Sequence, residues 1–407
     1  MLAIRTQFSN HFNQPPSLVV KSPGRINLIG EHTDYNHGFV LPAAIDKYIE
    51  LAIGKRTDGA IHMVALDLGE TIILPIYNLT PHATQWVNYI IGVVDQVFNK
   101  SQSAHNNFIG TQNTFTKTEI TTAVNETNLS GGFSICIQGN IPLGAGLSSS
   151  AAVECAVLFA INELYNLSLS KMQMALMAQQ AEHTFAGVKC GIMDMFASLH
   201  GQKNKAILLD CASLAFTYYP LELKDYSIVL FDTQIKHALA SSEYNTRRLE
   251  CEQGFKIIQE KYPSVKTFRD ISLEQVDECL ATRIKVYQRC KYVLEEIKRV
   301  QLAVKDLAMG DMHAFGKKML ETHEGLSKLY EVSCPELDFL VNAVSHNENV
   351  VGARMMGGGF GGCTINIIKT TAVEAITKEL TAKYNQVMHK ELSHYIVSIE
   401  DGTHLVS

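Results

Sequence analysis

Short apolar runs, separated by Gly, Asp or Pro, follow one another through the first half of the chain. Many of these runs are rich in β-branched residues, which is typical of strands in a mostly antiparallel sheet. Other segments repeat apolar residues at a helical spacing. The pattern predicts strands at 17–21, 48–56, 61–66, 71–76 and 133–138, and helices at 86–100, 148–165 and 170–186.

The second half of the chain is richer in helical spacing. It predicts strands at 205–211, 226–232, 350–355, 364–369 and 395–400, and helices at 241–262, 283–308, 311–328, 335–345 and 371–392. Helices packed on antiparallel sheets indicate an α+β fold. A break in the pattern at 220–225 predicts two lobes, 1–222 and 223–407. Residues 99–130 are polar with little periodicity, and we interpret them as a surface insertion.

Composition narrows the function classes. With 407 residues, 46% hydrophobic and 19% charged, the chain has the make-up of an ordinary globular protein. Its net charge of −6 gives no bulk attraction to nucleic acid or to an anionic membrane. Nine scattered cysteines without a CxxC pair argue against a zinc site or a disulfide framework. With no signal-peptide pattern and no apolar run of membrane-spanning length, we expect a cytoplasmic protein.

A loop rich in small residues precedes one predicted helix, in the string GNIPLGAGLSSSAAV that begins at Gly139. A helix N-terminus offers unpaired N–H groups to an anion, and glycine lets the backbone approach a phosphate closely. Serine hydroxyls can also donate to phosphate or bind Mg²⁺. No lysine follows the loop, so it is not a Walker A loop. The alternative is a plain loop with a serine N-cap.

Two further strings carry candidate chemistry. Five of the six residues from Gly357 to Gly362 are glycine, which predicts a close backbone approach to the phosphate loop or to a substrate. The segment GRINLIGEHTDYN (24–36) packs Arg, Glu, His and Asp together, a set that can bind the hydroxyls of a polyol and stabilise developing negative charge. A metal site at His32, Asp34 and His37 and a solvated acidic turn are the alternatives for this segment.

Taken together, these strings resemble the GHMP kinase superfamily, and within it the galactokinase family. Further likeness lies in CGIMDMFAS (190–198), SSEYNTRR (241–248) and YEVSCPELD (330–338). The resemblance spans nearly the whole chain. It implies a two-lobed fold, with a ribosomal-S5-like N-terminal lobe, a ferredoxin-like C-terminal lobe and the active site between them.

The resemblance also implies site residues. The family's catalytic base falls on Asp194, with Arg25 beside it to keep the carboxylate ionised and to neutralise charge on the transferring phosphoryl group. The sugar-binding positions fall on Glu31, His32, Thr33, Asp34, Gly191 and Tyr244. The ATP-binding positions fall on Gly144, Ala145, Gly146, Leu147, Ser148, Ser149 and Ser150. Trp86 lies in a segment that resembles the adenine side, where core packing is the alternative. The Mg²⁺ positions fall on Ser150 and Glu182.

The implied activity is the ATP-dependent phosphorylation of D-galactose at the C1 hydroxyl, with Mg²⁺ as cofactor and neither nucleic acid nor membrane as partner. We expect a monomer. A kinase for N-acetylgalactosamine and a non-catalytic galactose sensor are the alternatives, although the SSSAA string that such sensors lose is complete here. The chain departs from the family in its longer 99–130 segment and in Lys291, where the family usually has histidine. We expect neither to touch the chemistry.

Overall fold

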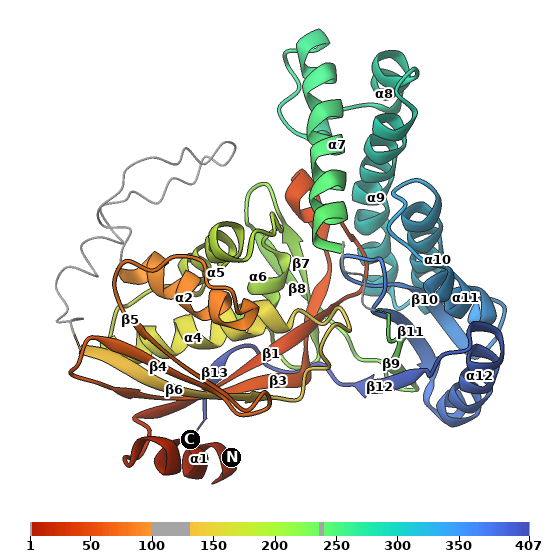
Figure 1. The fold of residues 1–407 in the computed structure, drawn as a ribbon. Helices are drawn as coiled ribbons and strands as arrows, with labels where there is room; N and C mark the ends of the chain where they lie inside the picture. Colours follow the sequence, from red (N-terminus) through yellow and green to blue (C-terminus); the bar gives the residue numbers. More distant parts are fainter. Residues whose placement is uncertain (1, 99–130, 236–239, 407) are drawn as a thin grey trace.

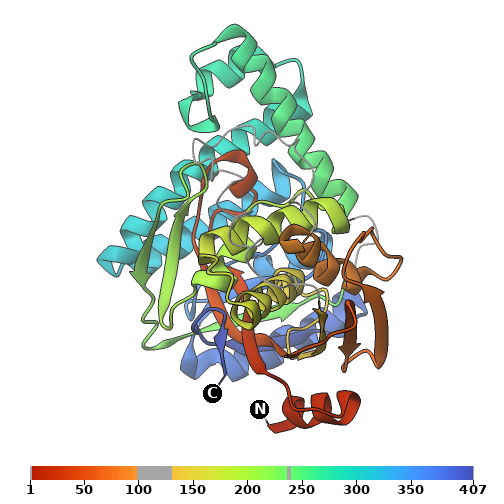
Figure 2. The same cartoon turned by 90° about the vertical axis from the view of Figure 1, so that its left-hand side faces the viewer.

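The computed structural model describes residues 2–98, 131–235 and 240–406. Figure 1 shows two lobes side by side, each built on a sheet with helices against it. The long helices α7 and α9 with the short α8 project away from both sheets, and the turned view in Figure 2 shows the same projection. The chain passes between the lobes more than once, so residues distant in sequence meet where the lobes join.

The strands form three sheets. The six-stranded sheet has the order β13-β1-β3-β6-β4-β5, the four-stranded sheet β10-β11-β9-β12, and the three-stranded sheet β2-β7-β8. The strands are β1 (Leu18–Asn27), β2 (Phe39–Val40), β3 (Pro42–Lys55), β4 (Ala60–Ala65), β5 (Glu70–Pro75), β6 (Gly132–Gly139), β7 (Lys205–Asp210), β8 (Phe216–Pro220), β9 (Tyr226–Asp232), β10 (Val350–Met355), β11 (Cys363–Lys369), β12 (Ser393–Val397) and β13 (His404–Leu405).

The helices are α1 (Leu2–Phe12), α2 (Gln85–Phe98), α4 (Ser149–Tyr165), α5 (Lys171–Ala181), α6 (Met193–His200), α7 (Ala240–Lys261), α8 (Leu273–Leu280), α9 (Ile284–Met309), α10 (Met312–Lys328), α11 (Pro335–Val344) and α12 (Val373–Met388). Short 3₁₀ turns lie at η1 (Asp34–Asn36), η4 (Phe268–Asp270) and η5 (Thr370–Ala372), and a π-helical turn at η3 (Glu182–Ala186).

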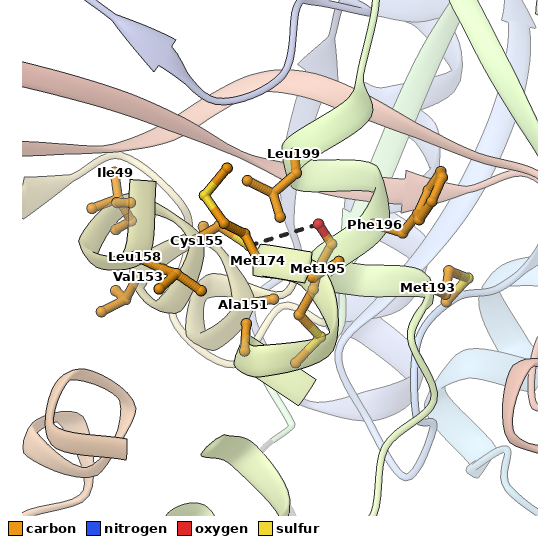
Figure 3. Close-up of a cluster of buried hydrophobic side chains, with 14 of the residues drawn as sticks. Ile49, Ala151, Val153, Cys155, Leu158, Met174, Met193, Met195, Phe196 and Leu199 are labelled. Atoms are coloured by element: carbon orange, nitrogen blue, oxygen red, sulfur yellow. Dashed lines mark hydrogen bonds between the residues drawn. The ribbon is translucent and has the colours of Figure 1, made fainter. Parts of the chain in front are cut away.

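The core of the first lobe fixes the two helices that start at the site. Cys155 of α4 lies against α6, where its Sγ is 3.6 Å from the carbonyl oxygen of Met195. Figure 3 shows Leu158 and Ala151 of α4 and Leu199 of α6 in this apolar cluster. These side chains are fully buried or nearly so. Because interiors are close-packed, the relative position of the two helix N-termini is tightly held.

The predicted elements are largely confirmed, and the fold is α+β with mostly antiparallel sheets. Among the described strands, β4 and β6 are the parallel pair. The division into 1–222 and 223–407 stays a prediction, and strand pairing adds that β13 returns to β1 of the first sheet. Residues 99–130 lie outside the described residues. Within the described ranges, no helix combines the length and apolar character needed to cross a membrane.

Candidate active site

The end of β1 and the start of α6 bring Arg25 and Asp194 together. The Arg25 guanidinium donates from Nε and Nη2 to the two carboxylate oxygens of Asp194 at 2.8 and 2.9 Å, and from Nη1 to the Gly146 carbonyl at 2.7 Å. Arg25 is 4% exposed, whereas the Asp194 side chain is 25% exposed. Such a bidentate pair holds the carboxylate in one orientation. The structure therefore places a partly exposed carboxylate with its counter-ion behind it.

The predicted phosphate loop lies directly against this pair. The loop follows β6, and Gly144, Gly146 and Ser148 all adopt left-handed backbone conformations (φ 81°, 76° and 58°). Ser148 precedes α4 without capping it, and its Oγ donates instead to Asp194 Oδ2 at 2.5 Å. The first N–H groups of α4 are thus left for an anion.

The glycine-rich third string packs against the phosphate loop, as its composition predicted. A Cβ atom on Gly357 would lie 3.2 Å from the Gly146 carbonyl oxygen, and one on Gly362 would lie 3.3 Å from Ala145. The string connects β10 to β11, so it carries this contact from the second lobe. Larger residues would separate the lobes at this point.

A pocket of about 220 Å³ opens between these segments. Both lobes and most of the predicted sugar positions contribute to its walls. Its lining residues are Arg25, Glu31, His32, Asp34, Glu182, Val188, Cys190, Met193, Asp194, Tyr244, Gly357, Gly358 and Gly359.

Glu31 is an ionised acid in the wall of the pocket. Its Oε1 accepts from the Gly357 N–H at 2.8 Å and from Arg354 Nη2 at 3.1 Å. Burial works against ionisation, but Arg354 and Arg25 together with the Gly357 N–H lower the pKa of Glu31. This carboxylate can accept hydrogen bonds from the hydroxyls of a ligand.

Asp34 lies in the same wall and is close to Asp194. Burial, with the charges of Asp194 and Glu31, raises the pKa of Asp34 to about 7. A Cβ atom on Gly191 would lie 1.9 Å from Asp34 Oδ2, so glycine is required there for the carboxyl group to fit. The predicted sugar residue Gly191 thus contacts Asp34, and it is the adjacent Cys190 that lines the pocket.

His32 is a neutral imidazole. Burial lowers the pKa of His32 to about 4. Its Nδ1 lies 2.7 Å from the Tyr35 hydroxyl, and its buried Nε2 has no hydrogen-bond partner. The Tyr244 ring from α7 lies 5.3 Å from the imidazole.

Glu182 and Ser150 meet beside the phosphate loop. Ser150 Oγ donates to Glu182 Oε1 at 3.2 Å. Burial and the nearby charge of Asp194 raise the pKa of Glu182 to about 7. Over the described part of the chain, no three or more His, Cys, Asp or Glu side chains form a group able to hold a metal ion. The alternative metal site at His32, Asp34 and His37 is therefore not formed.

Like Gly191 and the phosphate-loop residues 144–150, the predicted site residues Thr33 and Trp86 do not line the pocket. The Thr33 hydroxyl is 2.9 Å from the Gly30 carbonyl and 2.7 Å from the Phe39 carbonyl, so it stabilises the loop that carries Glu31 and His32. Trp86, at the start of α2, donates from Nε1 to Glu70 Oε2 at 2.6 Å and is partly exposed.

Arg354 is a residue of the candidate site that sequence reasoning did not identify, and Val188, Cys190 and Met193 of the pocket wall were not predicted either. It is fully buried, and its guanidinium donates to the Leu28 carbonyl at 3.0 Å and to the Met355 carbonyl at 2.6 Å as well as to Glu31. It joins the second lobe to the end of β1. The sequence does carry a signal for Arg354, which stands between apolar residues of a predicted strand. An arginine buried in that way needs several hydrogen-bond acceptors around it.

Three family models match the chain. "GHMP kinases N terminal domain" matches residues 113–202, and "GHMP kinases C terminal" matches residues 302–386. "Galactokinase galactose-binding signature" matches residues 6–55. A crystal structure of mevalonate kinase, at 20% identity and a TM-score of 0.61 over 95% of this chain and 100% of that one, shares the fold. The fold and the site thus define a GHMP kinase.

Similar proteins define the family more narrowly. The galactokinase of Thermosipho africanus is 39% identical over 94% of this chain and 98% of its own length. The galactokinase of Clostridium beijerinckii is 37% identical over 98% of this chain and 97% of its own. The crystal structure of Lactococcus lactis galactokinase complexed with galactose has a TM-score of 0.88 and 30% identity, covering 99% of both chains. The chain belongs to the galactokinase family.

Proposed function

We propose that this protein transfers the terminal phosphoryl group of ATP to the C1 hydroxyl of D-galactose, giving α-D-galactose 1-phosphate and ADP. One observation carries the proposal: the Asp194 carboxylate lines a pocket of about 220 Å³ and is fixed by Arg25 and by Ser148 of the phosphate loop. Membership of the galactokinase family agrees with this arrangement.

The acidic wall of the pocket accounts for sugar binding. Glu31 and Asp34 accept hydrogen bonds from sugar hydroxyls, and the partly exposed Tyr244 ring covers the side formed by α7. Carboxylates that are already held by protein donors lose little freedom when they bind a polyol. The sugar is therefore oriented by groups that are in place before it arrives.

Asp194 and Arg25 act on the reacting atoms. Asp194 accepts or orients the proton of the C1 hydroxyl, which makes that oxygen a better nucleophile. Arg25 holds the carboxylate ionised and neutralises charge on the phosphoryl group in transfer. The N-terminus of α4 and its glycine-containing loop bind the phosphates of ATP.

The hydroxyl of Ser150 and the carboxyl group of Glu182 fit a Mg²⁺ ion that is shared with the ATP phosphates. They are 3.2 Å apart and are hard oxygen ligands. Mg²⁺ commonly takes one or two protein ligands and keeps phosphate oxygens and water for the rest. When bound, the ion would neutralise phosphate charge, and Glu182 would ionise to hold it.

A sugar panel with ADP detection tests the function. With MgATP, we expect ADP formation with D-galactose and a product whose phosphate is on C1 by ³¹P and ¹³C NMR. Faster turnover of N-acetylgalactosamine would favour the related kinase. Binding of galactose and ATP without ADP would favour the sensor, and either result would overturn the proposal.

We further propose that the protein is a cytoplasmic monomer. All nine cysteines are free, which suits a reducing compartment. Sedimentation at several protein concentrations tests the oligomeric state.

A further inference from the structure

We propose that Tyr35 and Tyr330 are positioning residues that hold His32 in the neutral tautomer protonated on Nε2, so that the imidazole offers an N–H donor to an oxygen of the bound sugar. The identity of that sugar as galactose rests on the proposed function. The state of the ring does not, since it is a property of the protein alone.

The inference starts from a chain of polar atoms that ends at His32 and is half-buried at Tyr35. Its Nδ1 is 2.7 Å from the Tyr35 hydroxyl, which is 3.0 Å from the Tyr330 hydroxyl. The Tyr330 hydroxyl is in turn 3.2 Å from Cys251 Sγ. His32 and Tyr35 belong to the first lobe, Tyr330 follows α10, and Cys251 lies in α7. The chain therefore joins the sugar wall to two helical segments of the second lobe.

The hydrogens of this chain can run in two directions. Tyr35, Tyr330 and Cys251 each have one hydrogen to donate, and a neutral imidazole has one N–H and one acceptor nitrogen. If the hydrogens run toward His32, both phenol hydrogens reach good acceptors, an oxygen and an imidazole nitrogen. If they run away from it, one phenol hydrogen ends on sulfur, a weak acceptor.

The direction toward His32 is therefore favoured. The Cys251 S–H donates to Tyr330, the Tyr330 O–H donates to Tyr35, and the Tyr35 O–H donates to Nδ1 of His32. Because Nδ1 then accepts, the single hydrogen of the neutral ring lies on Nε2. Burial keeps the imidazole neutral. A second ring hydrogen, on Nδ1, would leave the Tyr35 O–H without an acceptor.

The other end of the imidazole lies in the wall of the pocket. Nε2 is buried without a hydrogen bond of good geometry, and His32 itself is 3% exposed. The Gly358 backbone interacts with the ring and raises the pKa of His32 against the effect of burial. The ring is held between the rings of Tyr330 at 4.9 Å and Tyr244 at 5.3 Å. A buried donor without a partner is unfavourable, so an oxygen lone pair of the ligand would satisfy it.

¹⁵N NMR of the sugar-free protein tests the tautomer directly. A His32→Gln variant assigns the His32 ring signals. We expect Nε2 to carry the hydrogen in the wild type, and a mixture or a change of tautomer in Tyr35→Phe and, more weakly, in Tyr330→Phe. Tyr165→Phe is the matched control, because it removes a tyrosine hydroxyl elsewhere in the molecule. That hydroxyl donates to the Gly132 carbonyl at the far end of α4. A hydrogen on Nδ1 in the wild type, or an unchanged tautomer in Tyr35→Phe, would overturn the proposal.

Sugar analogues test what the donor does. A deoxyfluoro sugar can accept a weak hydrogen bond but cannot donate one, whereas a deoxy sugar can do neither. The two analogues are compared at the sugar position that His32 contacts. There we expect the wild type to bind the fluoro analogue several-fold more tightly than the deoxy analogue. This advantage should vanish in Tyr35→Phe. Equal binding of both analogues at every position would contradict a donor at Nε2.

Steady-state kinetics separate positioning from general damage. In Tyr35→Phe we expect KM for galactose to rise about tenfold, with kcat and KM for ATP within about twofold of the wild type. A parallel loss in all three parameters would contradict a role confined to the sugar. If the wild type formed no ADP with galactose, the proposed function would fail, while the NMR result would still decide the tautomer.

Discussion

The two lobes contribute to the pocket in opposite ways. The first lobe supplies charged groups, with Arg25, Asp194 and Glu182 close together around the phosphate loop. The second lobe contributes the Tyr244 ring and the backbone of Gly357–Gly359 to the wall. Arg354, a charged residue of this lobe, is fully buried behind Glu31.

This difference suggests that the residues acting on the phosphoryl group and the residues orienting the sugar belong to different parts of the molecule. The groups that we propose to face the transferring phosphoryl group come from one core, in which α4 and α6 pack on the same sheet. The groups that we propose to orient the sugar depend on contacts across the lobes. Variants in the first set should change kcat, and variants in the second set should change sugar affinity or stability.

Removal of the Asp194 carboxylate should have the largest effect. We expect Asp194→Ala and Asp194→Asn to lower kcat by about 10³-fold or more while galactose still binds, because acid–base and electrostatic groups act on the transition state. Coupled ADP assays and calorimetry measure the two quantities. Asp277→Asn, at an exposed aspartate on α8, is the control. Retained turnover in the Asp194 variants would refute its catalytic assignment.

Arg354→Met should lower both the stability of the protein and its affinity for galactose. Removing one partner of a buried ion pair costs about 3–5 kcal/mol of unfolding free energy. Since Glu31 would lose its partner, we also expect weak galactose binding. Urea unfolding and calorimetry test both.

Arg289→Met is the matched control for Arg354→Met. Arg289 is 1% exposed and pairs with Glu250 and Glu331, neither of which lines the pocket, and it also donates to the Leu329 carbonyl beside Tyr330. We expect Arg289→Met to lose stability with a much smaller loss of galactose affinity than Arg354→Met. Equal affinity losses in both arginine variants would show that the effect is not specific to Glu31.

The elements and the composition of the site could be predicted because they depend on local patterns. The helix at α4 and the glycine-rich approach of Gly357 follow from periodicity and residue type. The helix α1 was missed because its apolar stripe is short, with Ile4 and Phe8 packing into a small cluster beside the first sheet. The helices α6, which carries Asp194, and α8 were missed as well, since each is only eight residues long.

The cross-lobe contacts could not be predicted, because no local pattern records them. The pairing of Arg354 with Glu31 joins residues 323 positions apart. The raised pKa values of Asp34 and Glu182 depend on burial next to Asp194, which only the folded chain creates. The role of Thr33 likewise depends on which loop carbonyls lie near its hydroxyl.

Gly191→Ala should weaken sugar binding with little change in kcat. A Cβ atom there would meet the Asp34 carboxyl group at 1.9 Å and push it out of place. We expect about a tenfold rise in the Kd for galactose, equivalent to ~1.4 kcal/mol. Gly69→Ala is the control: a Cβ atom there meets nothing within 4 Å, so the strain of its left-handed backbone (φ 65°) should lower stability without changing galactose affinity. Unchanged affinity in Gly191→Ala would show that Asp34 does not bind the sugar.

The raised pKa of Asp34 should appear as a pH dependence of stability. Its folded pKa of about 7 lies above the usual value of 3.8, so ionisation opposes folding as pH rises between them. Asp34→Asn should therefore stabilise the sugar-free protein at ~pH 8, on the order of 1 kcal/mol or more, and stabilise it less at ~pH 5. Urea unfolding at both pH values measures the difference. The same gain at both would show that Asp34 is ionised throughout.

Trp86→Phe should have the smallest effect, and it tests how far the nucleotide side extends from the charged core. The Trp86 indole donates to Glu70 across a partly exposed surface, so losing that bond should cost little stability. If the ring contacts adenine, KM for ATP should rise about two- to fivefold with KM for galactose unchanged, because the aromatic area is reduced rather than removed. Glu70→Gln keeps the ring in place and should leave both KM values unchanged. A loss of unfolding free energy with no change in KM for ATP would instead assign Trp86 to core packing, and the nucleotide site would then end at the phosphate loop and the N-terminus of α4.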